Sequence, residues 1–222
     1  MPKLPAKPPP QQRPMMDLAG DRDIEWTWVA AQFPMGPGRA LDFGCGHTPL
    51  APTAALRGFD TLGVDLQEIR RPFLIPNLRY VLGDINLLPL AEKYFDLIIN
   101  CSTVEHVGVV GRYDVTVDDP DGDLTAMRRL RMFMKQDAIH IMTIPVGVDT
   151  IWRPLHRIYG KQRLPLLLKG YRVEYARYWV KDDFNRWVPV PEETALTTPT
   201  APALYGLGCF VLKRDDAPES VP

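Results

Sequence analysis

The sequence predicts an α/β fold, with a mostly parallel sheet covered by helices on both faces. The chain has 222 residues, 45% of them hydrophobic, which is enough for one such domain and too few for two ordinary ones. An apolar run at residues 39–43 is followed by a helical stretch to Arg57, which Gly58 ends, and by a second apolar run at residues 61–65. This order is a βαβ unit, and its repetition along the chain favours a parallel sheet.

A helix is expected before the first strand. Ile24, Trp28 and Ala31 share one face at helical spacing, which predicts a helix from Asp21 to the break at residues 34–38. We expect this helix to cover the entrance of the domain.

The remaining elements follow the same alternation of apolar runs and helical periodicity. Further strands are expected at residues 78–82, 95–101, 138–144, 172–179 and 208–212, and a helix at residues 124–134. Asp121 or Asp123 is expected to cap the start of that helix.

The composition limits where the chain acts and what it binds. Residues 1–14 are proline-rich without apolar periodicity, so we expect a disordered tail followed by a single domain over residues 15–222. The formal net charge of -1 gives no overall field that attracts nucleic acid or an anionic membrane. No apolar stretch approaches the roughly 20 residues of a membrane span, and no secretion signal is present. With Cys45, Cys101 and Cys209 each in an apolar run, a reducing cytoplasmic location is expected.

A glycine-containing turn follows the first strand. Gly44 and Gly46 let the backbone approach a ligand closely. Pro49 stands where the dinucleotide fingerprint needs its third glycine, which disfavours NAD and FAD, and a P-loop motif is absent. Asp42 suits a ligand with an ammonium group, such as the methionine part of S-adenosylmethionine (SAM).

Acidic residues also follow the next two strands. Asp65 comes about 20 residues after Gly46, the separation at which an acid meets ribose hydroxyls in such folds. Asp84 offers an acceptor for an adenine amino group, and Ile85 an apolar side chain beside the ring. Each acid alone is explained as a turn residue, but the three features in order indicate an adenosine site.

Four runs of sequence, in this order, resemble the motifs of class I SAM-dependent methyltransferases. They are LDFGCG at 41–46, GVDL at 63–66, GDINLLPL at 83–90 and FDLIINCSTVEHVG at 95–108. The resemblance covers residues 39–145 and implies a Rossmann-like, seven-stranded sheet whose last strand is antiparallel. Stretches within residues 105–171 look more narrowly like bacterial methyltransferase-like domains of unknown function.

The resemblance implies SAM as the cofactor and gives its expected contacts. These are Asp42, Gly44 and Gly46 at the methionine end, Asp65 at the ribose, Leu66, Asp84 and Ile85 at the adenine, and Asn100 and Cys101 beneath the sulfonium. The residues at 135–137 differ from the proline-glycine-glycine turn of many relatives.

Glu105 and His106 directly follow the fourth expected strand. Methyl transfer to a hydroxyl requires alignment and removal of a proton, and histidine titrates near neutrality, so His106 is the candidate general base beside Glu105. Alternatively, this pair only orders the loop. A metal site of Glu105, His106 and His156 is a weaker alternative, and no metal is predicted.

Aromatic and basic residues follow the fifth expected strand. We expect Arg153, His156 and Tyr159 of this segment to contact the acceptor, and we expect the same of Arg112 and Tyr113. An equal alternative is that the segment after the fifth strand forms an amphipathic helix with a solvated basic face.

The predicted function is O-methylation of a small-molecule or carbohydrate acceptor. The alternatives are a non-catalytic SAM-binding module for regulation or assembly, and a nucleic-acid or protein methyltransferase, which the near-neutral charge disfavours. The sequence leaves the oligomeric state open.

Overall fold

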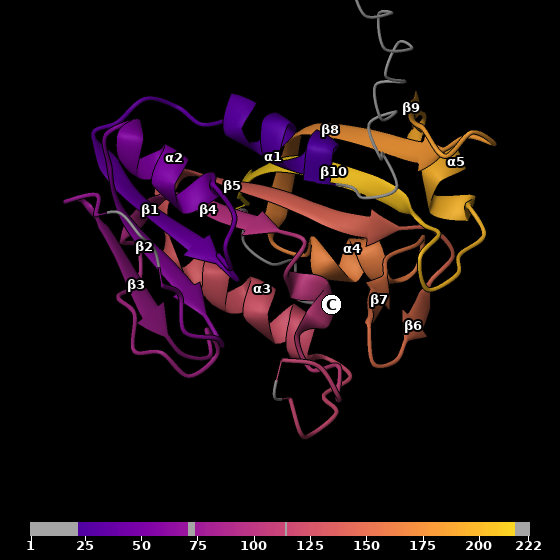
Figure 1. Ribbon diagram of the computed structural model, residues 1–222, viewed down its shortest axis with the longest axis horizontal. Coiled ribbons are helices and arrows are strands. Elements are labelled where there is room, and N and C mark those ends of the chain that lie inside the picture. The colour runs from indigo at the N-terminus through magenta and orange to yellow at the C-terminus, as the bar shows by residue number, and fades with distance from the viewer. Residues whose placement is uncertain (1–21, 71–73, 114, 216–222) are drawn as a thin grey trace, which may run out of the picture.

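A computed structural model describes residues 22–70, 74–113 and 115–215. The expected tail at residues 1–14 and the expected helix start at Asp21 lie outside these residues. Figure 1 shows a twisted sheet across the molecule, with helices α1 and α2 on one side and α3 and α4 on the other. The α/β class with helices on both faces is therefore confirmed.

The main sheet has eight strands in the order β3-β2-β1-β4-β5-β10-β8-β9. The strands are β1 (Gly38–Phe43), β2 (Phe59–Asp65), β3 (Leu78–Leu82), β4 (Phe95–Cys101), β5 (Met134–Val146), β8 (Tyr171–Lys181), β9 (Trp187–Val190) and β10 (Gly206–Arg214). The first five pair in parallel, and β10 is antiparallel to both β5 and β8. The expected seven strands thus become eight, because the short strand β9 pairs with β8 at the edge.

The two faces of the sheet carry different helices. The helices are α1 (Arg22–Ala31), α2 (Leu50–Leu56), α3 (Gly122–Phe133), α4 (Arg163–Leu167) and α5 (Glu192–Thr197), with a 3₁₀ turn η1 (Val104–His106). Val29 of α1 and Ala40 of β1 belong to one apolar cluster, whereas Leu130 of α3 and Leu41 of β1 belong to another. Neighbouring residues of β1 therefore face opposite helix layers, as the alternation of side chains along a strand requires.

Several local expectations are corrected. The alternative helix after β5 is replaced by the hairpin of β6 (Thr150–Trp152) and β7 (His156–Ile158). Residues 135–137, expected to form a turn, belong to β5, whose register with β4 shifts between Phe95 and Leu97. Residues 83–94, between β3 and β4, contain no helix.

The capping of α3 also differs from the expectation. Asp121 is at the cap position but makes no capping hydrogen bond, because its carboxylate lies 3.0 Å from Arg163. Asp123 is buried inside the first turn of the helix. Arg163 therefore forms ion pairs with both of the acidic residues that were expected to cap this helix.

The cysteines and the lengths of the described helices bear on the expected location. All three cysteines are free and buried. In the ranges that the structure describes, no helix is long and apolar enough to cross a bilayer.

Candidate active site

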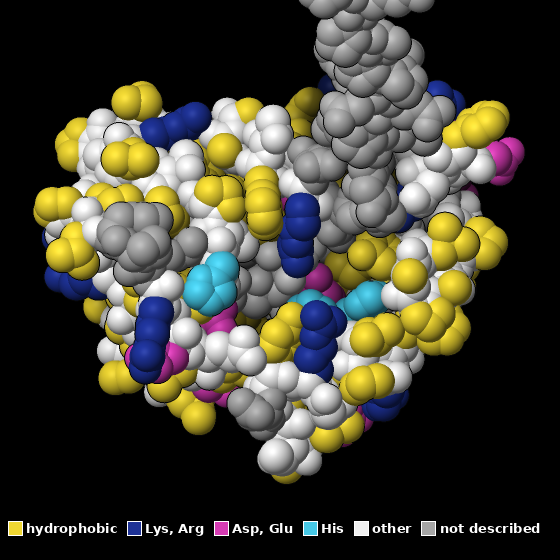
Figure 2. Space-filling view, viewed as in Figure 1, with side chains coloured by type: hydrophobic (Ala, Val, Ile, Leu, Met, Phe, Trp, Pro, Cys, Tyr) yellow, Lys and Arg dark blue, Asp and Glu magenta, His cyan; other side chains and the backbone are white. Residues whose placement is uncertain are grey.

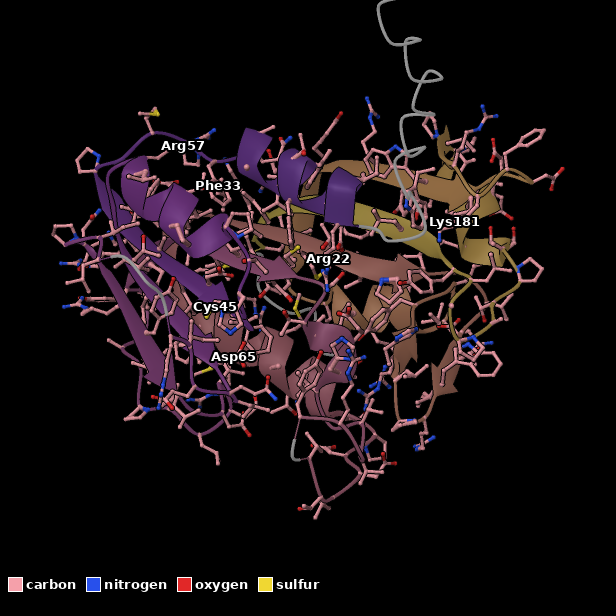
Figure 3. All side chains as sticks on the ribbon, in the orientation of Figure 1. Arg22, Phe33, Cys45, Arg57, Asp65 and Lys181 are labelled. Atoms are coloured by element: carbon pink, nitrogen blue, oxygen red, sulfur yellow. The ribbon has the colours of Figure 1, made fainter. Side chains whose placement is uncertain are left out.

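The carboxyl ends of the parallel strands bring the predicted cofactor residues together. Gly44 donates to the oxygen of Val64 at 2.8 Å, and Gly46 donates to Asp65 Oδ2 at 2.8 Å. Cys45 and Asp65 accordingly lie near each other in Figure 3. The turn after β1 is thus tied to the end of β2.

The two glycines have different surroundings. Both have positive φ, +67° at Gly44 and +42° at Gly46, which favours glycine. A Cβ atom on Gly44 would overlap the side chain of Thr103, whose hydroxyl donates to the Gly44 oxygen at 3.4 Å. A Cβ atom on Gly46 would meet only Asp65 Oδ2, at 4.0 Å. Gly44 therefore accommodates the loop after β4, and Gly46 faces open space.

Asp65 keeps acceptor capacity for a ligand. Its Oδ2 accepts from Gly46, and its Oδ1 accepts from the backbone of Gln67 at 2.9 Å. Each carboxylate oxygen has two lone pairs, so both oxygens can accept a further hydrogen bond. Leu66, next to it, is 44% exposed and presents an apolar surface. Asp42, at the end of β1, is buried.

The turn after β3 holds Asp84 and Ile85 differently from the expectation. Asp84 Oδ1 accepts from the backbone of Asn86 at 2.8 Å, which fixes the turn. Ile85 is only 2% exposed and packs in the core with Val64 and Met127. Its side chain leaves almost no surface for a ring to lie against, so exposed Leu66 is the better candidate for that contact.

Asn100 and Cys101 lie beneath the surface at the end of β4. Asn100 Oδ1 accepts from the backbone of Val104 at 3.2 Å, and the Thr143 hydroxyl lies 3.5 Å from Cys101 Sγ. Burial raises the pKa of the Cys101 thiol. These contacts hold the strand end from which η1 begins.

Glu105 and His106 are the second and third residues of η1. The Nδ1 atom of His106 lies 2.7 Å from the oxygen of Leu155, and its Nε2 atom lies 3.7 Å from Glu105 Oε1. Burial lowers the pKa of His106 to about 3. The near-neutral titration expected for His106 is therefore wrong, because the hairpin covers the ring. Since a carbonyl oxygen only accepts, Nδ1 carries the proton of the neutral ring and Nε2 carries the lone pair.

Two aromatic rings lie next to His106, and a third lies next to one of them. Its ring centre lies 5.2 Å from that of Tyr113 and 6.1 Å from that of His156, which in turn lies 5.3 Å from Tyr205. Arg112 lies over the Tyr113 ring at 4.7 Å. On the face drawn in Figure 2, histidine side chains lie beside acidic and basic ones near the centre. No sequence motif pointed to Leu155 or Tyr205. Folding brings Leu155 to His106 and Tyr205 to His156.

Two of the expected acceptor residues have other partners. Tyr159 is completely buried, and its hydroxyl donates to Asp123 at 3.1 Å, so the expected acceptor contact is wrong for this residue. Arg153 is exposed and pairs with Asp118 at 2.5 Å. Arg157, another basic residue of the segment after the fifth expected strand, is buried and donates to the oxygen of Asp119 at 2.6 Å. Arg157 thus fixes the hairpin to the loop that follows η1.

The alternative metal site is not assembled. Among the described residues, no three or more His, Cys, Asp or Glu side chains form a group able to hold a metal ion, and this includes Glu105, His106 and His156.

A cavity of about 670 Å³ lies elsewhere, against β2 and β3. Its walls include Leu62, Val81, Leu90 and Tyr94. Gly44, Gly46, Asp65, Glu105 and His106 are not among the residues that line it, so this cavity is separate from the candidate site.

Comparison with known proteins extends this picture. A family model described as a Caenorhabditis protein of unknown function, DUF268, matches residues 82–184, less than half of the chain. No curated protein matches the sequence.

Solved structures match almost the whole chain. The Burkholderia thailandensis 1,6-didemethyltoxoflavin-N1-methyltransferase, with bound 1,6-didemethyltoxoflavin and S-adenosylhomocysteine, is 18% identical, with 90% of this chain and 80% of that chain covered and a TM-score of 0.60. A SAM-dependent methyltransferase from Archaeoglobus fulgidus is 17% identical, with 88% and 96% covered and a TM-score of 0.60. The cyclase SpnF is 15% identical, with 86% and 80% covered and a TM-score of 0.62.

Identities this low establish a shared fold and do not establish a shared reaction. The resemblance to class I SAM-dependent methyltransferases is confirmed at that level: this chain has their fold.

Proposed function

We propose that this chain transfers the methyl group of SAM to an oxygen atom of a small-molecule or carbohydrate acceptor, with residues 15–222 as a single catalytic domain. The observation that carries the proposal is the open space at Gly46, which Asp65 borders. The neighbouring Gly44 lies against Thr103, the residue from which the turn with Glu105 and His106 begins. Ligands in open α/β sheets bind at this end of the strands.

The donor contacts follow from the polar groups at the strand ends. Asp65 has lone pairs left for the ribose hydroxyls, and Asp84 retains an oxygen beyond the one that accepts from Asn86. Asp42 lies buried at the end of β1, beside the glycine turn, where a carboxylate suits an ammonium group. Bound SAM would supply an electrophilic methyl group on a sulfonium.

His106 is proposed to receive the acceptor's proton at Nε2. A base with a pKa of about 3 is weak, but it stays unprotonated at neutral pH. A hydroxyl oxygen becomes a strong acid once it has gained a methyl group, so a weak base can take its proton late in the reaction. Glu105, 3.7 Å away, would stabilise the imidazolium that forms.

The acceptor is proposed to be ring-shaped. Tyr113 and His156 lie beside His106, Tyr205 lies beside His156, and such aromatic surfaces pack against flat rings and against the C–H face of sugars. Exposed Arg112 would favour an acceptor that also carries a negative group.

Two measurements test this function. Calorimetry should detect binding of both SAM and S-adenosylhomocysteine, and incubation with methyl-labelled SAM should transfer label to a member of a panel of sugars and phenolic metabolites. If neither compound gives a binding signal, the proposal is wrong.

A binding protein without methyl transfer is the second candidate. The similarity to the cyclase SpnF is relevant to it only because this fold also occurs in a protein named for a reaction other than methyl transfer. Tight binding of SAM with no transfer of label to any acceptor or cell extract would support this candidate.

A further inference from the structure

A buried glutamate from the first helix reaches the strand ends. Glu25 of α1 is fully buried, and its Oε1 accepts from the Thr143 hydroxyl at 2.7 Å and from the Ser102 hydroxyl. Its Oε2 lies 2.8 Å from Arg22 Nη1. In Figure 3, Arg22 extends from α1 toward the middle of the molecule. One carboxylate thus joins α1 to the loop after β4 and to β5.

Burying the Glu25 carboxylate costs free energy, and apolar packing alone could hold α1 against the sheet. Burial of an unpaired charge is strongly unfavourable, and it is tolerated only with an opposite charge and hydrogen bonds. Val29 and Trp28 already provide apolar contacts between α1 and the sheet. Glu25 therefore fixes a specific position of the helix relative to Ser102 and Thr143.

Ser102 is the residue at which the chain leaves β4 for η1. Its φ is +48°, an uncommon conformation for serine, and its backbone nitrogen donates to the oxygen of Thr143 at 3.0 Å. The next residue, Thr103, fills the space over Gly44. Glu105 and His106 follow within one turn. The direction of this segment therefore depends on how Ser102 is held.

We propose that Glu25 is a positioning residue for methyl transfer. Through Ser102 it holds the segment that carries Glu105 and His106 in line with the donor turn at Gly44. Glu25 itself acts through Ser102 and is not assigned a contact with the ligands. This inference rests on the proposed function, and it adds α1 to the parts of the chain that the reaction requires.

The test compares Glu25→Ala, Glu25→Gln and Ser102→Ala with the wild type. We expect Glu25→Ala to lower kcat at least tenfold while the Kd for S-adenosylhomocysteine changes less than threefold. Glu25→Gln keeps an acceptor oxygen for Ser102 and Thr143, so it should recover most of kcat. Thr27→Ala, on the exposed side of the same helix, is the control and should leave kcat unchanged.

A double variant separates positioning from general destabilisation. If Glu25 acts through Ser102, Glu25→Ala with Ser102→Ala should lose no more kcat than the worse single variant. Losses that multiply, or a folded Glu25→Ala protein with wild-type kcat, would overturn the proposal. If Glu25→Ala does not fold, the proposal requires Ser102→Ala alone to lower kcat with donor affinity kept, and wild-type kcat in that variant would overturn it. Wild-type turnover is measured first, because its absence refutes the proposed function rather than this role.

Discussion

His106 donates its Nδ1 proton to the oxygen of Leu155, across 2.7 Å and between segments that lie far apart in the sequence. Leu155 is in the turn of the β6–β7 hairpin, so the hairpin sets the orientation of the imidazole. The same contact selects the tautomer whose Nε2 lone pair is available. The proposed base, His106, and the β6–β7 hairpin, which carries His156 of the proposed acceptor site, are therefore held together.

Removal of this imidazole tests the proposed base. We expect His106→Ala to lower turnover about 10²-fold or more, the usual contribution of a positioned base. Affinity for S-adenosylhomocysteine should be retained, because His106 belongs to the acceptor side. Labelled-SAM assays and calorimetry on the same preparation measure the two quantities, and full turnover in the variant would discard the base assignment.

The depressed pKa of His106 predicts how turnover depends on pH. Because burial lowers this pKa to about 3, the imidazole remains unprotonated from pH 8 down to about pH 5. Turnover at saturating donor should therefore show no loss that depends on His106 in this range. An activity loss with an apparent pKa close to 6.5 that disappears in His106→Gln would show that the ring titrates as an exposed histidine.

The two glycines after β1 should respond differently to alanine. In Gly44→Ala the new Cβ overlaps Thr103 at a positive φ, so we expect a lower free energy of unfolding and a displaced η1. In Gly46→Ala the Cβ points into open space, so stability should fall by only about 1 kcal/mol. The same methyl group would occupy the proposed donor space, and affinity for S-adenosylhomocysteine should fall at least tenfold. Urea unfolding and calorimetry check both variants, and unchanged affinity in Gly46→Ala would place the donor elsewhere.

Asp65 and Asp60 lie on the same strand and form a matched pair. We expect Asp65→Ala to raise the Kd for S-adenosylhomocysteine at least tenfold, because hydrogen bonds to a charged acceptor contribute about 1.5–3 kcal/mol each. The side chain of Asp60 is 45% exposed and pairs with Arg79 at 3.2 Å, at the opposite end of β2, so Asp60→Ala should leave the Kd unchanged. Equal effects of the two substitutions on Kd would contradict the ribose assignment.

The sequence predicted the sheet better than the small elements around it. The runs at residues 78–82 and 95–101 became β3 and β4 with the expected bounds, because each apolar run ends at turn or polar residues. The β6–β7 hairpin and β9 were missed, since strands of three or four residues carry too little periodicity to distinguish them from loops.

Within the candidate site, sequence order identified the residues at strand ends but not their surroundings. The burial of Ile85 and Tyr159 depends on α3. Ile85 belongs to the same apolar cluster as Met127 of this helix, and Tyr159 donates a hydrogen bond to its Asp123. The role of Glu25 depends on Ser102 and Thr143, which are distant in the sequence. Such contacts follow from tertiary packing, for which a single sequence contains no local signal.

His140 should make the stability of the fold sensitive to acid. It lies fully buried on β5, and neither ring nitrogen has a hydrogen-bond partner among the described residues. Its ring centre lies 5.4 Å from that of Tyr171. Burial lowers the pKa of His140 from 6.5 to about 3.

The sign of the effect follows from which state binds the proton. Between about pH 3 and pH 6.5 the unfolded chain protonates this histidine and the folded chain does not, so the free energy of unfolding falls as the pH falls through this range. At pH 5 the loss is about 2 kcal/mol for one such histidine. His140→Leu, of similar volume, removes this term, so its loss of stability between pH 7 and pH 5 should be smaller than that of the wild type by about that amount. Urea unfolding at both pH values measures the difference, and equal losses in the two proteins would mean that His140 is protonated in the folded state.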